Sequence, residues 1–255
     1  GVKNQEIREF LRGEGAVQVG FAPVDRFVAA PLGHGPRDFL PEAQTVISWA
    51  IRIPTGVVQY DNYLVDSQVF PQNDRLAILH NNVYGRLGYS VMNMISDQMS
   101  IRLLWQLEAR GYQAVGFPAT YNEFHGSPSD SARSGYRAPF SHRHGAVAAG
   151  LGEFGLNNLL VTKEYGSFVR LNSIITNLAL EASPLVTEPI CLRENCGLCR
   201  QGCVALEVIT SDLEQIFYTT PSRTDHKKCV ETPGCQTRGS CLRTCPLGAS
   251  AGFGC

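Results

Sequence analysis

The stretches CLRENCGLCRQGC (residues 191–203) and KKCVETPGCQTRGSCLRTCP (residues 227–246) contain eight of the nine cysteines of this chain. The ninth, Cys255, is the final residue, and the first 190 residues contain no cysteine. Disulfides explain this pattern poorly, because the count is odd and the N-terminus GVKNQEIREF has no apolar signal segment. The clustering therefore predicts a cofactor module that follows a cysteine-free body.

The spacing within the two runs favours iron–sulfur clusters. The first run reads C-x4-C-x2-C-x3-C and the second reads C-x5-C-x5-C-x3-C-P. Each is a stretched form of the bacterial ferredoxin run, in which the fourth cysteine ligates the other cluster. Pro246 matches that run, whereas Val204 and the wider loops depart from it. Two zinc ions held by four thiolates each are the alternative, because C-x2-C spacing also suits tetrahedral zinc.

On this logic the two runs exchange their fourth cysteines, and two 4Fe–4S clusters result. The ligands predicted for the first cluster are Cys191, Cys196, Cys199 and Cys245. The ligands predicted for the second cluster are Cys203, Cys229, Cys235 and Cys241. Cys255 is left without a predicted role.

Composition limits the possible partners. The chain has 255 residues, of which 44% are hydrophobic, enough for a sizeable core. Its formal net charge is -1, so no global charge attracts it to nucleic acid or to an anionic membrane. No stretch approaches the length of a transmembrane helix. We expect a cytoplasmic globular protein with neither a nucleic-acid nor a membrane partner.

The body alternates between helical and extended patterns. A helix is expected at 5–12 with Asn4 as its N-cap. Residues 74–110 are expected to form one long helix, or two helices broken near Gly85 and Gly88, that end at Gly111. The apolar residues of this segment recur every four positions, at Leu87, Val91, Ile95, Met99, Leu103 and Leu107. Strands are expected at 16–24, 45–53, 114–119, 159–166 and 167–176. Interleaved helices and strands predict an α/β or α+β layer fold.

Residues 131–158, SARSGYRAPFSHRHGAVAAGLGEFGLNN, stand out in this body. Five basic or imidazole groups are followed by three glycines, at Gly150, Gly152 and Gly155. This composition indicates a turn that contacts an anion or a cofactor, since glycine lets backbone N–H groups approach a ligand. The alternative is a solvated loop followed by a tightly packed turn. The glycines match G-x-G-x-x-G, but they follow a helix-like segment, so a dinucleotide site is poorly supported.

The segment AGLGEFGLNNLLVTKEYGSFVRLNSIITNLAL (149–180), followed by the cysteine runs, resembles the epoxyqueuosine reductase and reductive dehalogenase superfamily. The stretches GAVQVGFAPVDRF (15–27) and AQTVISWAIRI (43–53) look like the same family, so the resemblance spans essentially the whole chain. It implies an α+β fold in two parts. Residues 1–185 would form a nitroreductase-like α/β sandwich of the corrinoid-binding type, and residues 186–255 a bacterial two-cluster ferredoxin-like domain.

The resemblance also implies roles for individual residues. Residues expected to contact the corrinoid are Gly150, Gly152, Gly155 and Asn157. Epoxyqueuosine reductases have a D-T-x-P-V-x-E-R segment before A-G-L-G, and here Pro139 and Arg143 match it while Tyr136 replaces the aspartate. Reductive dehalogenases use a tyrosine as proton donor, so Tyr136 is the expected acid. Arg137 or Arg143 would hold an anionic substrate or stabilise the phenolate.

The function implied by the resemblance is that of an oxidoreductase. A low-potential donor of the ferredoxin or flavodoxin type would reduce the clusters, and these would reduce a cobalamin that acts on a small organic substrate. The chain lacks the helical-repeat extension of the tRNA-modifying members, which favours a small substrate over tRNA. Two alternatives remain open: an electron-transfer protein without corrinoid, and a partner protein that reduces corrinoid for another enzyme. The sequence does not distinguish a corrinoid from a flavin.

Overall fold

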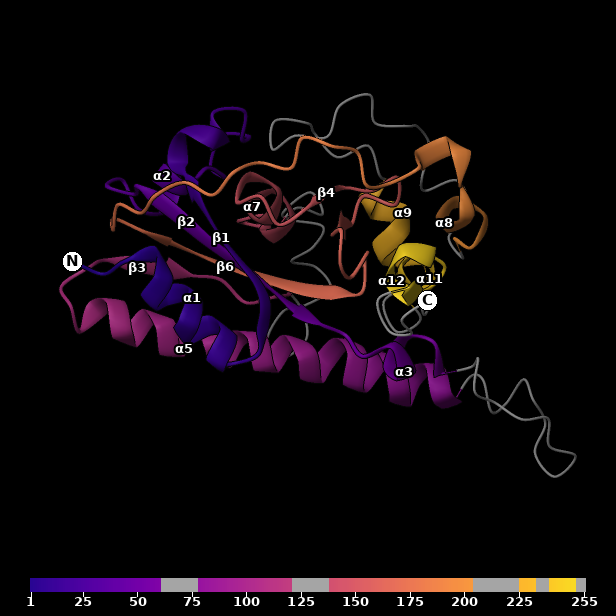
Figure 1. Ribbon diagram of the computed structural model, residues 1–255. Coiled ribbons are helices and arrows are strands. Elements are labelled where there is room, and N and C mark those ends of the chain that lie inside the picture. The colour runs from indigo at the N-terminus through magenta and orange to yellow at the C-terminus, as the bar shows by residue number, and fades with distance from the viewer. Residues whose placement is uncertain (61–77, 121–137, 204–224, 233–238, 251–255) are drawn as a thin grey trace, which may run out of the picture.

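The computed structural model describes residues 1–60, 78–120, 138–203, 225–232 and 239–250. Its central element is a four-stranded antiparallel sheet in the order β1-β2-β6-β3 (Figure 1). The strands are β1 (Ala16–Pro23), β2 (Thr45–Arg52), β6 (Val169–Thr176) and β3 (Ala114–Gly116). Helices and an antiparallel sheet in one chain agree with the expected α+β class.

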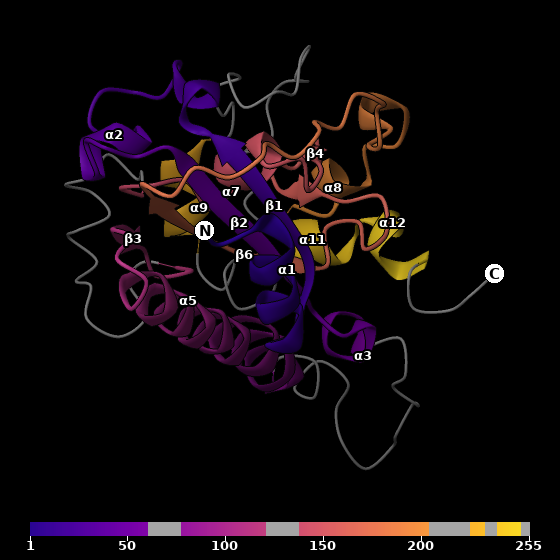
Figure 2. The same ribbon diagram turned by 60° about the vertical axis from the view of Figure 1, so that its left-hand side comes forward.

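Helices cover both faces of the sheet, as Figure 2 shows. One face packs against α1 (Asn4–Gly13) and α5 (Met92–Glu108), and the other against α7 (His142–Ala148). Successive side chains of β2 point to opposite faces of the sheet, so Trp49 packs on the side of α1 and α5 and Ala50 on the side of α7. The close approach of α7 requires Gly145, whose added Cβ would lie 3.0 Å from Ser48 Oγ.

The long helix is present but does not bury the predicted stripe. It consists of a π-helix, η3 (His80–Val91), that continues directly into α5. Met99, Leu103 and Leu107 are buried, whereas Leu87 and Ile95 are 47% and 40% exposed. A strict four-residue step drifts around a helix of 3.6 residues per turn, and the π-helical segment changes the step again. The face that meets the sheet instead contains polar residues, at Asn93, Ser96 and Ser100.

The first helix begins one residue earlier than predicted, and its cap differs. Lys3 occupies the N-cap position and makes no capping bond with its side chain. Asn4, the predicted cap, instead bonds the backbone of Glu181: its Nδ2 donates to the carbonyl oxygen, and its Oδ1 accepts from the N–H. The prediction was wrong because a contact distant in sequence competes for the asparagine side chain.

Three predicted strands keep their place within two residues, and two are much shorter. The strand expected at 159–166 is reduced to β5 (Leu160–Val161), which pairs with β4 (Glu153–Phe154) in a separate small sheet. A turn closed by reciprocal hydrogen bonds between Thr162 and Gly166 follows it. The strand expected at 114–119 is limited to β3. Short helices lie in the connections: η1 (Val24–Phe27) and α2 (Pro36–Phe39) between β1 and β2, and α3 (Thr55–Val58) after β2.

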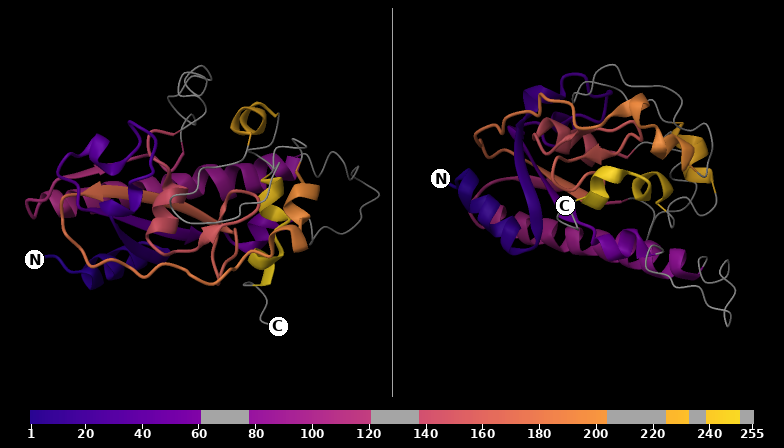
Figure 3. Two further views of the ribbon diagram at one scale, coloured as in Figure 1. Left: turned by 90° about the horizontal axis from the view of Figure 1, so that it is seen from above. Right: turned by 45° about the vertical axis from the view of Figure 1, so that its right-hand side comes forward.

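The cysteine-rich segment forms short helices at one end of the sheet (Figure 3). They are η4 (Arg193–Asn195), α8 (Leu198–Gln201), α9 (His226–Glu231), α11 (Ser240–Arg243) and α12 (Pro246–Ser250). A hydrophobic cluster joins them to the body, in which Leu242 packs with Ile53, Tyr84 and Phe168. In the part of the chain that the structure describes, no helix has the length and apolar character needed to cross a membrane.

Candidate functional site

Four cysteines from both runs meet at one cavity. Cys191, Cys196 and Cys199 come from the first run, and Cys245, directly before α12, comes from the second. The rest of the lining comes from three places in the chain: Leu156, Asn157 and Val161; Leu192, Arg193 and Gly197; and Pro246 and Leu247. The four cysteines are the residues predicted for the first cluster.

Three further cysteines gather beside this cavity. Cys203 is buried and packs against Cys229, and both interact electrostatically with Cys241. Cys199 of the first group also interacts with Cys241, so the two groups are neighbours. The fourth predicted member of this group, Cys235, lies outside the described residues, as does Cys255.

The described cysteines are buried or half-buried. All seven described cysteines are free rather than disulfide-bonded. Burial, reinforced by neighbouring cysteines, raises the pKa of Cys199 to about 11 and that of Cys241 to about 12. Iron ligation at either position therefore has to release a proton. Within the described ranges, no three His, Cys, Asp or Glu side chains are grouped closely enough to hold a single metal ion.

A buried glutamate fixes the backbone at the first cysteine. Glu153, in β4, is 6% exposed, and its Oε1 accepts hydrogen bonds from the N–H groups of Ile190 (2.9 Å) and Cys191 (2.6 Å). Sequence reasoning missed Glu153, although it lies inside the glycine motif. Its partners are 37 and 38 residues away, so no local pattern could indicate them.

Arg143 lies in α7, beside the second cysteine group. Its Nη1 donates to the carbonyl oxygen of Asn158 at 2.6 Å, and its guanidinium interacts electrostatically with Cys229 and Cys241. Burial lowers its pKa, and the two sulfur groups oppose that shift. The other two predicted catalytic residues, Tyr136 and Arg137, lie outside the described residues, so their position relative to Arg143 stays a prediction.

The two histidines that flank Arg143 are held by protein contacts. The ring Nε2 of His142 lies 2.9 Å from the Pro118 carbonyl oxygen, and its buried Nδ1 has no hydrogen-bond partner. Burial lowers the pKa of His142 to about 4, with the Pro118 bond acting in the opposite direction. The ring of His144 bonds Ser141 Oγ at 2.7 Å and lies edge-on to Phe154. His142 is therefore a half-buried imidazole whose inner nitrogen is shielded from solvent and whose lowered pKa keeps it neutral at neutral pH.

The three glycines pack against other parts of the protein. Gly150 has a φ of +75°, and a Cβ at this position would lie 2.0 Å from the carbonyl oxygen of Pro184. A Cβ at Gly152 would lie 2.3 Å from the Val161 carbonyl oxygen, and one at Gly155 would lie 2.6 Å from a Val161 methyl group. These observations support the packed-turn alternative. Contact of these glycines with a cofactor stays a prediction.

Asn157 connects the glycine-rich loop to both cysteine groups. It is 6% exposed and contributes to the wall of the first cavity. Its Nδ2 donates to the carbonyl oxygen of Cys241 at 3.2 Å, and its Oδ1 accepts from the N–H of Leu159 at 3.1 Å. The structure thus places Asn157 between the two cysteine groups, and its predicted contact with a corrinoid stays untested.

A buried tyrosine that sequence reasoning missed adjoins the second group. Tyr84, in η3, is 2% exposed, and a Cβ on Gly239 would lie 2.6 Å from its hydroxyl oxygen. Arg170 Nη2 donates to that hydroxyl at 3.4 Å. Burial raises the pKa of Tyr84, and Cys241 is among the groups that act on it. In the sequence, Tyr84 is a tyrosine in a predicted helix that contains glycines. This pattern is also that of an ordinary core residue, so it could not have identified Tyr84.

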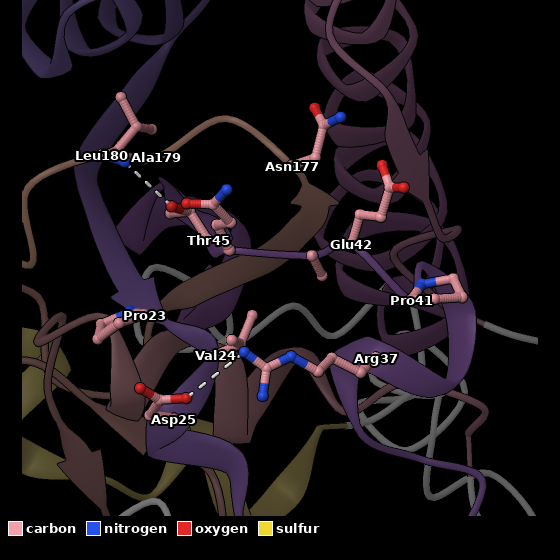
Figure 4. Close-up of a pocket in the computed structure, with 12 residues that line it drawn as sticks. Pro23, Val24, Asp25, Arg37, Pro41, Glu42, Thr45, Asn177, Ala179 and Leu180 are labelled. Atoms are coloured by element: carbon pink, nitrogen blue, oxygen red, sulfur yellow. Dashed lines mark hydrogen bonds and ion pairs between the residues drawn. The ribbon is translucent and has the colours of Figure 1, made fainter.

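A groove of about 690 Å³ lies at the opposite end of the sheet from the cysteines. Its lining includes Thr45, at the start of β2, and Asn177, directly after β6 (Figure 4). Arg37 and Asp25 form an ion pair of 3.7 Å across it, with side chains 63% and 81% exposed. The groove therefore lies apart from the cysteine groups.

Known structures of similar fold were found, although no protein-family model and no curated sequence matches the chain. An epoxyqueuosine reductase from Bacillus subtilis gives a TM-score of 0.58 at 16% identity, over 98% of this chain and 66% of that one. A reductive dehalogenase, described in connection with B12-dependent dehalogenation, gives 0.60 at 15% identity, over 95% of this chain and 31% of that one. The chain thus spans about two thirds of the first protein and one third of the second.

A further epoxyqueuosine reductase, in complex with an epoxyqueuosine-modified tRNA-Tyr stem loop, gives a TM-score of 0.55 at 15% identity, over 98% of this chain and 66% of that one. This complex of a protein with a similar fold conflicts with the expectation, drawn from net charge, that this chain has no nucleic-acid partner. Nearly the whole described chain has the fold that epoxyqueuosine reductases and reductive dehalogenases share, as its sequence resemblance to them predicted.

Proposed function

We propose that this chain is an iron–sulfur oxidoreductase in which two 4Fe–4S clusters pass electrons to a bound corrinoid and from there to a small organic substrate. One observation carries the iron–sulfur part: Cys245 from the second run lines the same cavity as three cysteines of the first run. An exchange of fourth cysteines between two runs is the arrangement of two-cluster ferredoxins. In this proposal residues 186–255 are the ferredoxin-like domain, and residues 1–185 the nitroreductase-like domain.

The cysteine groups suit clusters in chemistry and in position. Thiolate sulfur is the ligand that iron–sulfur clusters use, and the described members of both groups are free cysteines. The electrostatic interaction of Cys199 with Cys241 places the groups side by side. Two clusters held there would be neighbours and could exchange electrons directly.

The corrinoid part rests on the likeness in fold to a reductive dehalogenase. When bound, a corrinoid supplies a cobalt ion that becomes a strong nucleophile and reductant on reduction. From this chain, Arg143 would contribute a fixed positive charge that holds an anionic substrate. Tyr136 would donate the proton, since a phenol with its ordinary pKa near 10 is protonated at neutral pH. The packing of Gly150 and Gly152 against protein atoms gives no support to a corrinoid cradle at those residues.

That packing favours a second candidate function. The chain would carry clusters and transfer electrons, or reduce a corrinoid bound by another protein, without substrate chemistry of its own. Both candidates need the same two clusters. They differ in whether this chain binds a corrinoid stably.

Three measurements on anaerobically prepared protein test the proposal. Iron and acid-labile sulfide should each approach about eight per chain, as two 4Fe–4S clusters require, and a zinc-only protein would refute the iron–sulfur part. Titration with hydroxocobalamin should then show saturable binding and a reduced-cobalt spectrum after addition of a low-potential donor. Intact clusters without binding would leave the electron-transfer function. Tyr136→Phe should abolish turnover while preserving corrinoid binding, and unchanged turnover would eliminate Tyr136 as the acid.

A further inference from the structure

The two cysteine groups have different charged neighbours. At the first group, the buried carboxylate of Glu153 accepts the N–H of Cys191. The carboxylate places a negative charge beside the first group. Its hydrogen bond also occupies an N–H group that could otherwise donate to a cluster sulfur. Hydrogen bonds to the sulfurs and local charge both influence the reduction potential of such clusters.

A cation is also present at the first group. Arg193 lines the cavity, and its Nη2 donates to the carbonyl oxygen of Phe154 at 3.0 Å. Phe154 directly follows Glu153, so these two opposite charges are held on adjacent residues of β4. Their effects on the first group offset each other in part.

At the second group, Arg143 is held by the Asn158 carbonyl and interacts with Cys229 and Cys241. Asn157, the residue before this anchor, donates to the Cys241 carbonyl oxygen. Arg143 and Cys241 are thereby fixed to adjacent residues of one loop. The second group therefore adjoins the Arg143 guanidinium, whereas the first adjoins both the Glu153 carboxylate and the Arg193 guanidinium, which offset each other in part.

We propose that Glu153 and Arg143, acting as positioning residues that ligate no iron, set the two clusters at different potentials, with the first cluster lower than the second. This inference rests on the proposed function, because it requires both clusters. A cluster with four thiolate ligands is negatively charged and becomes more so on reduction. A nearby cation stabilises the reduced form and a nearby anion destabilises it, and burial strengthens both effects.

The order of potentials gives the electron a direction. A low-potential one-electron carrier reduces the first cluster, whose cavity is lined by Leu192, a side chain that is 62% exposed. The electron then moves to the second cluster, which becomes reduced as the first returns to its oxidised form. The second cluster lies beside α7 and Arg143, the residue proposed to hold an anionic substrate. Electrons therefore enter at the exposed side and leave at the side of the chemistry.

The test is a dye-mediated redox titration of the cluster-loaded protein, followed by the EPR signals of the reduced clusters. Cys199→Ser and Cys241→Ser assign each signal to its cluster. Arg143→Gln should lower about tenfold the ratio of protein with the second cluster reduced to protein with the first cluster reduced, equivalent to about 59 mV for one electron. Glu153→Gln, which keeps an acceptor oxygen for Cys191, should raise the potential of the first cluster. Arg143→Lys should restore most of the potential.

Matched controls come from the groove at the other end of the sheet (Figure 4), where Arg37→Gln and Glu42→Gln should leave both potentials unchanged. This inference alone would be overturned if Arg143→Gln and Glu153→Gln, each with a full iron content, had the same cluster potentials as these two control variants. Absence of cluster signals from the wild-type protein would overturn the proposed function and this inference with it. If Arg143→Gln loses a cluster, the wild-type protein reduced by one electron per chain tests the order of potentials instead. Its EPR signal should be the one that Cys241→Ser alters, which belongs to the second cluster. A signal from the first cluster would refute the proposed order.

Discussion

Asn157 donates a hydrogen bond from Nδ2 to the carbonyl oxygen of Cys241 at 3.2 Å, and this bond joins the glycine-rich loop to the second cysteine run across 84 residues of sequence. The same loop contains Glu153, which bonds the first run at Cys191. One short segment of the body thus fixes the backbone of both runs. The position of the cysteines is a property of the whole fold rather than of the cysteine-rich segment alone.

Asn157→Ala should destabilise the cluster-loaded protein by about 1–3 kcal/mol, because it removes two hydrogen bonds in a buried setting. Anaerobic urea unfolding measures the change in the free energy of unfolding. Asn81→Ala, at an exposed position of η3, is the control and should change that free energy by less than about 0.5 kcal/mol. Equal effects of the two substitutions would contradict the bridging role of Asn157.

The glycine motif provides a second prediction. Gly150→Ala should destabilise the fold by more than about 2 kcal/mol, since it combines a left-handed backbone with a clash against Pro184. Gly152→Ala tests the close packing separately, because its backbone is not left-handed. Gly13→Ala is the matched control: a Cβ there meets nothing within 4 Å, so stability should be unchanged or slightly improved. Thermal unfolding of the three variants checks this, and a tolerated Gly150→Ala would leave cofactor contact as the better account of the motif.

Local patterns predicted the strands of the main sheet well. β1 and β2 begin at their predicted residues and end one residue early, since alternation and a following proline at Pro54 are visible in the sequence. The cysteine spacing indicated Cys191, Cys196, Cys199 and Cys245 as one group, and the structure brings these four to one cavity, while their ligation of a cluster stays a prediction. The strand pattern depends on residues that are close in sequence, and the cysteine pattern depends on a recurring spacing.

Contacts between distant segments could not be predicted in this way. Asn4 has the composition of a helix cap but bonds Glu181, and Glu153 reads as part of a glycine turn but bonds Cys191. The face of α5 that meets the sheet includes Ser96, which accepts from Trp49 Nε1 at 3.2 Å. A hydrophobic pattern cannot indicate a buried surface whose polar groups are paired by hydrogen bonds.

The long helix provides a prediction that distinguishes the two halves of its apolar pattern. Leu103→Ala should cost about 2–5 kcal/mol, because Leu103 is 1% exposed and its removal leaves a cavity against the sheet. Ile95→Ala, at a position 40% exposed, should cost less than about 1 kcal/mol. Denaturant unfolding of both variants checks this. Similar losses of unfolding free energy in the two variants would mean that another molecule covers Ile95 in solution.

His142 makes stability depend on pH. Its folded pKa of about 4 lies below the ordinary value of 6.5, so the unfolded chain binds the proton more readily. The contribution of the neutral imidazole is present above about pH 6.5 and is lost as the pH falls toward 4. Between pH 7.5 and 5.5 the loss should be about 1 kcal/mol. His142→Gln should remove this part of the slope, which urea unfolding at the two pH values measures, and an unchanged slope would refute a neutral His142.

The exchange of fourth cysteines leads to the last prediction. Cys203 belongs to the first run by sequence, but it packs with Cys229 of the second run, whereas Cys245 of the second run lines the cavity of the first. Cys203→Ala should therefore damage the second cluster and leave the first intact, and Cys245→Ala should do the reverse. Each variant should retain about half of the iron, and EPR of the reduced protein identifies the cluster that remains.

The two substitutions serve as controls for each other, because both remove one thiol from the fourth position of a run. Cys255→Ala supplies a third comparison and should keep the full iron content, since Cys255 is not among the eight predicted ligands. Loss of the first cluster alone in Cys203→Ala would mean that each run holds its own cluster. The presence of Cys245 in the first cavity would then have to arise from packing of α12 rather than from ligation.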